Sequence, residues 1–228
     1  MIVSCHQPNY LPYLGYFDKI KNCDIFVLFD DVQLPQSNKD NFETKNKIKT
    51  SNGVLELNVP ILKRGDRVFI KDALIYDNGW RKKHLRSIIF AYKKAPFFNQ
   101  YIKEIKRIYN THWNKLVDLN VSLIKLFNKI LGIKTEMVFS SDLKIETTGE
   151  QKIIDIVKKL NGDAYISGTG AGSKRYIIPE DFKREGIKLI WRDFQCPTYH
   201  QLWGEFVPNL SVIDYLMCEG GIMNNVNL

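Results

Sequence analysis

The sequence is short of several features that would place it in a special class of protein. No uninterrupted apolar run approaches the roughly 20 residues that a membrane-spanning helix needs. Its four cysteines are scattered and include no Cys-x-x-Cys pair, which argues against a zinc site and against a disulfide framework. The first residues are apolar and are not a basic segment with a cleavage site, so we expect a cytoplasmic protein with reduced cysteines.

What the sequence does contain is typical of a globular protein. It has 228 residues, of which 44% are hydrophobic and 12% aromatic, and this is enough apolar material for a substantial core. There is no internal repeat and no low-complexity linker. We therefore expect a single domain over residues 1–228, with a helical insertion at about 79–132.

The positive charge is concentrated in one segment. Between Gly79 and Arg107, nine lysine and arginine residues stand against Glu104 alone, and the resulting net charge of +8 equals that of the whole chain. Two interpretations stay open, a solvated helical surface and a docking surface for an anionic partner such as an acidic acyl carrier protein. The aromatic residues of the segment fall at core spacing and form no stacking platform, so we expect no nucleic-acid binding.

Two apolar stretches near the start of the chain each end in polar residues. Residues 1–5 lead to His6, and Pro8 prevents this strand from continuing inside a sheet. A second apolar run, 25–29, ends in the same way at Asp30. Parallel strands joined by helical connections bind ligands in the crevice at their carboxyl ends, so these polar residues predict a site.

The remaining pattern predicts an α/β protein, with a Rossmann-like, mostly parallel sheet and a helical insertion in the middle of the chain. Apolar residues lie at helical spacing through 79–132, where Gly132 supplies a stop. Thr147 and Glu150 have the spacing of a capping box, and Ser211 begins a similar pattern. Further strands are predicted at 54–60, 68–75, 137–139, 164–166 and 187–191.

The two strand ends supply the candidate catalytic residues. His6 is a candidate general base, because its unperturbed pKa of about 6.5 leaves it largely neutral near pH 7; the alternative is a structural histidine that holds the turn. At most one of Asp30 and Asp31 should face His6, to orient it or to bind the ammonium of an amino sugar. One aspartate and one histidine are too few ligands for a metal, so we predict none. Gln7 and Gln33 are candidate donors to an oxyanion.

A glycine-rich turn is the third candidate. It runs from Ser167 through Gly168 and Gly170 to Ser173, directly after a predicted strand and before a segment able to start a helix. Alternating glycines let backbone N–H groups approach an anion, so the turn is a candidate diphosphate site, with a merely flexible loop as the alternative. It matches neither G-x-G-x-x-G nor a Walker loop.

Several motifs together closely resemble the WbqC-like family. They cover the chain from His6 to Gly220 and comprise His6-Gln7-Pro8-x-Tyr10-x-Pro12-x-x-Gly15-Tyr16-Phe17, Asp30-x-Val32-Gln33, Asn46-Lys47-Ile48-Lys49, Trp80-x-x-x-His84, Tyr92-x-x-Ala95-Pro96, Tyr165-x-Ser167-Gly168 and Tyr199-x-Gln201, followed by Phe206, Leu210-Ser211 and Asp214. One departure is Lys45, because the family resemblance leads us to expect arginine directly before Asn46-Lys47-Ile48-Lys49. An ammonium cannot make the bidentate contact of a guanidinium.

The resemblance implies a role in the assembly of a surface polysaccharide. Genes of this family lie in bacterial O-antigen clusters, and one suggested role is the transfer of glycine or a similar acyl group during assembly of an unusual sugar. Together with the patterns above, it implies a set of substrate-binding residues: Asn9, Tyr10, Asp31, Lys45, Asn46, Lys49, His84, Ser167, Gly168, Gly170, Tyr199, Gln201 and Asp214.

We therefore expect an acyl or aminoacyl transferase that acts on a nucleotide-linked amino sugar, whose amine attacks an activated acyl donor with His6 as general base. No tightly bound cofactor is expected, and the donor would be an acyl carrier thioester or a coenzyme A thioester. Two alternatives stay open: a nucleotide-sugar or carbohydrate binding module without catalysis, and a nucleotidyltransferase-like enzyme. Against the second, Asn9 stands where a His-x-Gly-His turn would have its second histidine. Nothing in the sequence indicates an oligomeric state.

Overall fold

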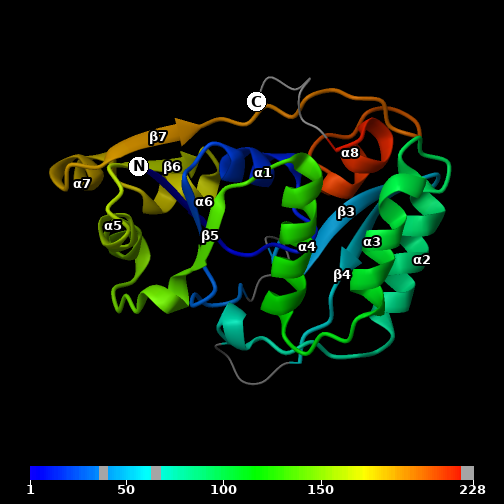
Figure 1. The fold of residues 1–228 in the computed structure, drawn as a ribbon, viewed down its shortest axis with the longest axis horizontal. Helices are drawn as coiled ribbons and strands as arrows, with labels where there is room; N and C mark the ends of the chain where they lie inside the picture. The colour runs from blue at the N-terminus through cyan, green and yellow to red at the C-terminus, as the bar shows by residue number, and fades with distance from the viewer. Residues whose placement is uncertain (36–40, 63–67, 222–228) are drawn as a thin grey trace.

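Five parallel strands form the central sheet of the protein, in a computed structural model that describes residues 1–35, 41–62 and 68–221. All four pairings between neighbouring strands are parallel, and the strand order is β5-β2-β1-β6-β7 (Figure 1). The predicted α/β class with a parallel sheet is thus confirmed. The strands are β1 (Ile2–His6), β2 (Ile25–Leu28), β5 (Glu136–Phe139), β6 (Ala164–Gly168) and β7 (Lys188–Arg192).

Different helices cover the two faces of this sheet. One face packs on α1 (Leu14–Lys21) and α4 (Leu116–Leu131), and the other packs on α5 (Gly149–Lys159) and α7 (Pro179–Arg184). Successive residues of a strand point to opposite faces. Cys5 therefore joins the core under α5 and α7, where burial raises its pKa to about 12, and its thiol does not form a dyad with the neighbouring histidine.

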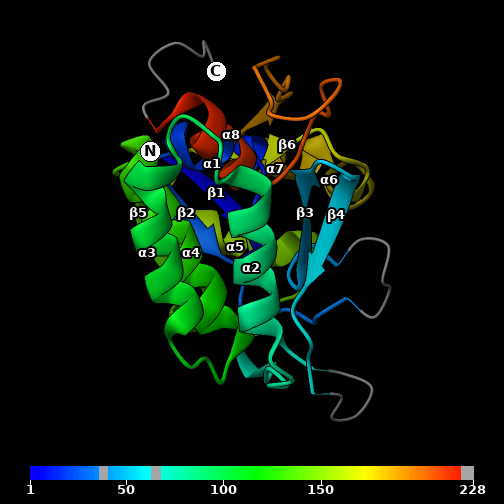
Figure 2. The same ribbon diagram turned by 90° about the vertical axis from the view of Figure 1, so that its right-hand side faces the viewer.

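The chain between β2 and β5 forms a second group of elements beside the sheet. It contains the antiparallel hairpin of β3 (Lys45–Thr50) and β4 (Gly53–Asn58), and then α2 (Trp80–Tyr92), α3 (Phe98–Asn110) and α4. Figure 1 shows the hairpin with α2 and α3 on the right and the sheet on the left, and Figure 2 shows α2, α3 and α4 lying side by side. The predicted helical block is present, and α4 ends at Gly132, whose φ of 71° is left-handed.

Two local predictions were wrong. Residues 68–75 form no strand, because a 3-10 helix η1 (Ile70–Asp72) breaks the extended backbone and leaves only isolated bridges. The capping box also fails, because Thr148 precedes α5 and the hydroxyl of Thr147 donates instead to Asp155 at 2.5 Å. Side-chain partners in the folded protein thus replaced a bond that local spacing favoured.

Only one of the two bonds predicted for the cap of the last helix is present. Ser211 precedes α8 (Val212–Glu219), and its hydroxyl oxygen accepts from the backbone N–H of Ile213 at 3.3 Å. The return bond of a capping box is missing, because the N–H of Ser211 donates to the carbonyl oxygen of Lys47 and the carboxylate of Asp214 accepts from tyrosine hydroxyls. None of the helices in the described ranges has the length and apolar character needed to cross a bilayer, and all four cysteines are unpaired.

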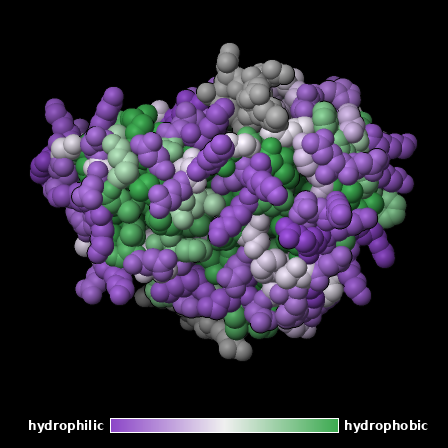
Figure 3. Space-filling model, viewed as in Figure 1, coloured by the Kyte–Doolittle hydropathy of each residue, from purple (hydrophilic) through white to green (hydrophobic). Residues whose placement is uncertain are grey.

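The positively charged segment lies on the outward faces of α2 and α3. Hydrophilic side chains project along the right-hand edge of the molecule, over these two helices (Figure 3). Seven of the nine cationic side chains make no ion pair within the described part of the chain; only Arg81 and Arg107 do, with Asp77 and Glu104. The segment is therefore a cationic surface, and the structure leaves its two interpretations open.

Candidate functional site

The carboxyl ends of the strands line up along one edge of the sheet. Ser4 of β1 pairs with Ile166 of β6, so His6 and Gly168, two residues further along, end their strands side by side. Asp30 follows β2, the neighbour of β1 on the other side. The strand order reverses between β1 and β6, and doubly wound sheets bind ligands at such a switch point. The predicted positions of His6 and of the glycine turn therefore meet there.

Side-chain amides fix the turn after β1. Asn120 of α4 donates from Nδ2 to the carbonyl oxygen of Pro8 at 2.8 Å, and Asn46 of β3 donates to the carbonyl oxygen of Leu11 at 2.6 Å. These bonds replace the sheet ladder that the prolines of the turn exclude. Asn46 was predicted to bind substrate, but here its amide group holds backbone: its Oδ1 also accepts from the N–H of Lys47 at 2.8 Å.

His6 is neutral and held in one orientation. Its Nδ1 lies 3.0 Å from the carbonyl oxygen of Gln7, so this nitrogen carries the proton and Nε2 is left as an acceptor. The ring of Tyr16 packs edge-on against it, with 5.0 Å between centroids. Burial and, second, the positive charge of Lys19 lower the pKa of His6 to about 3. Lys19 itself is buried and donates to the carbonyl oxygen of Cys5 at 2.9 Å.

The two aspartates after β2 share the hydroxyl of Ser140 but otherwise have different partners. Asp30 is 4% exposed and accepts from the backbone N–H and the hydroxyl of Ser141, at 3.0 and 2.7 Å. Asp31 forms an ion pair with Lys152 of α5 at 2.7 Å, on the opposite face of the sheet. Neither aspartate is hydrogen-bonded to His6 in the described structure, so the carbonyl of Gln7, and no carboxylate, orients the imidazole.

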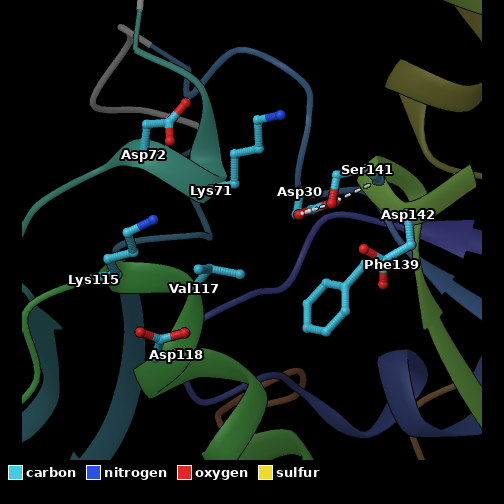
Figure 4. Close-up of a pocket in the computed structure, with 9 residues that line it drawn as sticks. All are labelled: Asp30, Lys71, Asp72, Lys115, Val117, Asp118, Phe139, Ser141 and Asp142. Carbon is cyan, nitrogen blue, oxygen red and sulfur yellow. Dashed lines mark hydrogen bonds between the residues drawn. The ribbon is translucent and has the colours of Figure 1, made fainter. Parts of the chain in front are cut away.

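A cavity of about 280 Å³ opens beside Asp30. Figure 4 shows the segments around it: the end of β2, the end of β5 with the 3-10 helix η2 (Ser140–Leu143) that follows it, the first turn of α4, and η1. No group of three or more histidine, cysteine or acidic side chains in these or the other described segments is arranged to bind a metal ion. The lining residues are Asp30, Lys71, Asp72, Lys115, Val117, Asp118, Phe139, Ser141 and Asp142.

The glycine turn after β6 has no structural need for glycine. Gly168, Gly170 and Gly172 do not have left-handed φ angles, and a Cβ atom at any of them would meet nothing within 4 Å. Ser167 is buried, and its hydroxyl donates to the carbonyl oxygen of Gly168 at 3.3 Å. The following helix α6 (Ala171–Tyr176) is short, so any anion would be held by backbone N–H groups of the turn itself.

Four of the other predicted residues, Lys49, Tyr199, Gln201 and Asp214, belong to a buried network. Lys49 donates from Nζ to Oε1 of Gln201 at 2.9 Å, and Gln201 donates to the hydroxyl of Tyr199 at 3.2 Å. The hydroxyls of Tyr199 and Tyr92 both donate to the carboxylate of Asp214, at 2.8 Å each. Asp214 is fully buried, and burial raises its pKa. This network ties β3 to α2 and α8, so its groups already have protein partners.

Tyr10 and His84 lie in a buried aromatic cluster. The hydroxyl of Tyr10 is 2.8 Å from Nδ1 of His84 and 2.5 Å from the hydroxyl of Tyr109, and the ring of Trp80 lies 5.1 Å from that of His84. Burial lowers the pKa of His84 to about 4, so it is neutral. Although both were predicted to bind substrate, here they anchor α2 to the turn after β1.

Lys45 and Gln33 stand apart from the strand ends. Nζ of Lys45 lies 3.2 Å from a carboxylate oxygen of Glu56, and both line a separate groove of about 440 Å³ on the hairpin. Gln33 is exposed, and its backbone forms an isolated bridge with Phe69. Neither side chain is hydrogen-bonded to a residue of the sheet edge in the segments that the structure describes.

Reasoning from the sequence missed Glu43, which lies next to the turn after β1. Its carbonyl oxygen accepts from the same Asn120 amide that holds Pro8, at 2.8 Å. The carboxyl is 4% exposed, and its Oε2, like Oδ1 of Asn9 and of Asn120, has no hydrogen-bond partner among the described residues. Burial raises the pKa of Glu43 to about 7. Apart from Phe42, which is itself exposed, its neighbours in the sequence are polar, so no hydrophobic pattern indicated that it would be buried.

These features define a doubly wound α/β protein with a candidate ligand site at the carboxyl edge of its sheet. The model of the WbqC-like protein family matches residues 7–224, and the chain belongs to that family, as its motifs indicated. It is similar to the uncharacterized protein Rv1507c of Mycobacterium tuberculosis, with 32% identity over 222 residues, which are 96% of this chain and 94% of the relative. No solved structure matches the chain significantly.

Proposed function

We propose that the protein is an enzyme that joins an acyl or aminoacyl group to the amine of a nucleotide-linked amino sugar, in O-antigen or other surface polysaccharide synthesis. The observation that supports this most directly is the row formed at the sheet edge by Gly168, His6 and Asp30. Neighbouring strands lie about 4.8 Å apart. A diphosphate held at the glycine turn would place its sugar beside His6, with the amine within reach of Asp30.

The reaction needs a proton acceptor and a stabilised oxyanion. The neutral amine attacks the carbonyl carbon of the thioester, an N–C bond forms, and the nitrogen gives a proton to Nε2 of His6. When the tetrahedral intermediate collapses, the C–S bond breaks and the thiolate takes that proton from the imidazolium. Gln7, which follows the base directly, is the candidate donor to the oxyanion. Such a base contributes typically 10²–10⁴-fold to the rate.

His6 can act as this base only if its pKa rises when the substrate binds. With a pKa of about 3 in the free protein, the imidazole is a weak base. A diphosphate at Gly168 would place negative charge beside it and stabilise the imidazolium, so the pKa of His6 should rise on binding. In this scheme His6 becomes an effective base in the complex with the nucleotide sugar.

A panel of nucleotide sugars tests the proposal. Each would be added in a thermal-shift assay, and those that stabilise the protein would be incubated with acyl and aminoacyl thioesters and analysed by mass spectrometry. The expected result is a product heavier than the sugar nucleotide by one acyl group. Binding without a mass change under any donor would favour a binding module, and transfer of a nucleotidyl group would favour a nucleotidyltransferase.

The glycine turn gives a first prediction. Gly170→Val should weaken the binding of the nucleotide sugar at least tenfold, because the branched side chain blocks close approach of the phosphates to the backbone. The protein itself should fold normally, because a Cβ atom at this position meets nothing within 4 Å. Calorimetric titration checks the affinity and a melting curve checks the fold. Unchanged affinity in a folded variant would show that the phosphates do not bind at this turn.

The cationic surface gives a second prediction. If an acidic carrier protein delivers the acyl group, charge reversal at Lys82, Arg86 and Lys93 should slow its association and flatten the salt dependence, because these exposed cations would no longer steer it. Stopped-flow measurements at several salt concentrations check this. The matched control reverses three exposed lysines of α5, α7 and β7: Lys159, Lys183 and Lys188. Equal association rates for the two triple variants would show that the segment is only a solvated surface.

A further inference from the structure

The cavity beside Asp30 has the size and position of a site for one sugar ring. Its volume of about 280 Å³ is just below the range of about 300–1,000 Å³ that is typical of small-molecule pockets, so it suits a single ring better than a whole nucleotide. It opens at the carboxyl ends of β2 and β5, and β2 is the direct neighbour of the strand that ends in His6. A ligand seated there would lie one strand away from the end of β1, although His6 is not among the residues that line the cavity.

The lining of the cavity favours a polyhydroxylated cation. Four carboxylates face two ammonium groups, so the pocket has an excess of negative charge and of hydrogen-bond acceptors. Sugar hydroxyls and an ammonium group donate to carboxylates, whereas Phe139 and Val117 offer an apolar wall to the C–H face of a ring. An anion would meet the wrong charge, and a purely apolar ligand would leave the carboxylates without partners.

Asp30 is the most strongly positioned of these carboxylates. It is 4% exposed and is fixed by the hydroxyl and the backbone N–H of Ser141. The hydroxyl of Ser140 lies 3.1 Å from Asp30 but closer to Asp31, at 2.5 Å. Figure 4 shows the bonds from Ser141 at one side of the cavity, with the start of α4 across from them. A largely desolvated, oriented carboxylate binds an ammonium more strongly than an exposed one does.

We propose that this cavity is the acceptor site, in which an amino sugar places its ammonium on Asp30 and its hydroxyls on the carboxylates of Asp118 and Asp142. The assignment rests on the proposed function for the chemical class of the sugar. The cavity itself, its charge and its place at the ends of β2 and β5 come from the structure alone. Asp30 then has two tasks. It selects the ammonium form of the sugar, and after the ammonium has released one proton to solvent it holds the neutral amine toward the end of β1, where Nε2 of His6 takes the second proton during the attack.

Calorimetric titration without any acyl donor tests the assignment. The probes are 2-, 3- and 4-amino-deoxyglucose, with glucose and N-acetylglucosamine as uncharged controls, all at one ionic strength. We expect at least one amino sugar to bind ten times more tightly than glucose. The double variant Asp118→Asn/Asp142→Asn should lose at least tenfold in that affinity. Glu136→Gln, at the amino end of β5, removes an exposed charge from the opposite end of the same strand and should change nothing.

Three outcomes would overturn the acceptor site. They are equal binding of charged and uncharged sugars, no binding of any amino sugar, and displacement of the amino sugar by magnesium chloride but not by sodium chloride at equal ionic strength. The proposed function fails separately. Amino-sugar binding without acyl transfer would support the acceptor site and contradict the proposed reaction. Acyl transfer with an unchanged KM in the double variant would support the reaction and contradict the acceptor site.

Discussion

Replacing Glu43 with glutamine is expected to stabilise the folded protein above pH 7 by about 3 kcal/mol. The carboxyl is 4% exposed, its Oε2 has no partner in the described structure, and burial raises its pKa from 4.5 to about 7. Between these two pH values the folded protein binds a proton that the unfolded chain has released. Stability is therefore lost as pH rises through this window, and glutamine, which is never charged, avoids the loss.

Urea unfolding at several pH values checks this prediction. Below about pH 4.5 the Glu43 carboxyl is protonated in both states, so the free energies of unfolding of wild type and Glu43→Gln should be similar. The two values should diverge between pH 4.5 and pH 7 and stay about 3 kcal/mol apart above pH 7. Glu136→Gln, which changes an exposed carboxyl, should leave the pH profile unchanged. Parallel profiles for wild type and Glu43→Gln would mean that Glu43 is solvated or paired. A destabilising charge beside the turn of His6 is the kind of feature that functional sites retain.

Replacing His6 with asparagine should lower turnover by on the order of a hundredfold or more, with little change in substrate affinity or melting temperature. Asparagine retains a hydrogen-bonding group of similar reach but accepts no proton near neutral pH. The free Nε2 is the atom that the variant loses, because Nδ1 already donates to the carbonyl of Gln7 at 3.0 Å. Turnover, affinity and melting temperature should be measured on one preparation.

His84 provides the matched control for this experiment. It is also a neutral histidine, but it is buried in the aromatic cluster with Tyr10 and Tyr109, whereas His6 is half-buried. His84→Asn should therefore lower the melting temperature, because it removes packed ring contacts, and the folded fraction should turn over normally. If His6→Asn behaves like His84→Asn, His6 is a structural residue, and the proposed mechanism loses its base.

Much of the fold could be predicted because its elements follow local rules. The apolar runs that became β1 and β2 end in polar residues, and the helical spacing before Gly132 continued to the end of α4. The strand predicted at 68–75 failed because its backbone bonds go to different neighbours, with Phe69 bridging Gln33 and Ile75 bridging Ile61. Such pairings between distant segments leave no periodic signal in the sequence.

The candidate site was predictable only in part. The motifs supplied polar residues at strand ends and on predicted helices without distinguishing their surroundings, and the fold separates these residues into distinct environments. His6, Gly168 and Asp30 share the sheet edge, whereas Asp214 and His84 are enclosed with protein partners. A motif shows that residue types occur together, but their hydrogen-bond partners come from other elements, and those partners determine which groups are left for a ligand.

The sequence by itself determined the family, the α/β class and the polar strand ends, because these depend on hydrophobic spacing and on the prolines that end β1. Only the tertiary structure decided the tautomer of His6, the burial of Glu43 and the cavity beside Asp30. Each of these depends on segments far apart in the chain: Asn120 of α4 lies against Pro8, and Ser141 lies against Asp30. Electrostatic environment is set by such contacts, since desolvation depends on which atoms surround a group in space, whatever its neighbours in the sequence are.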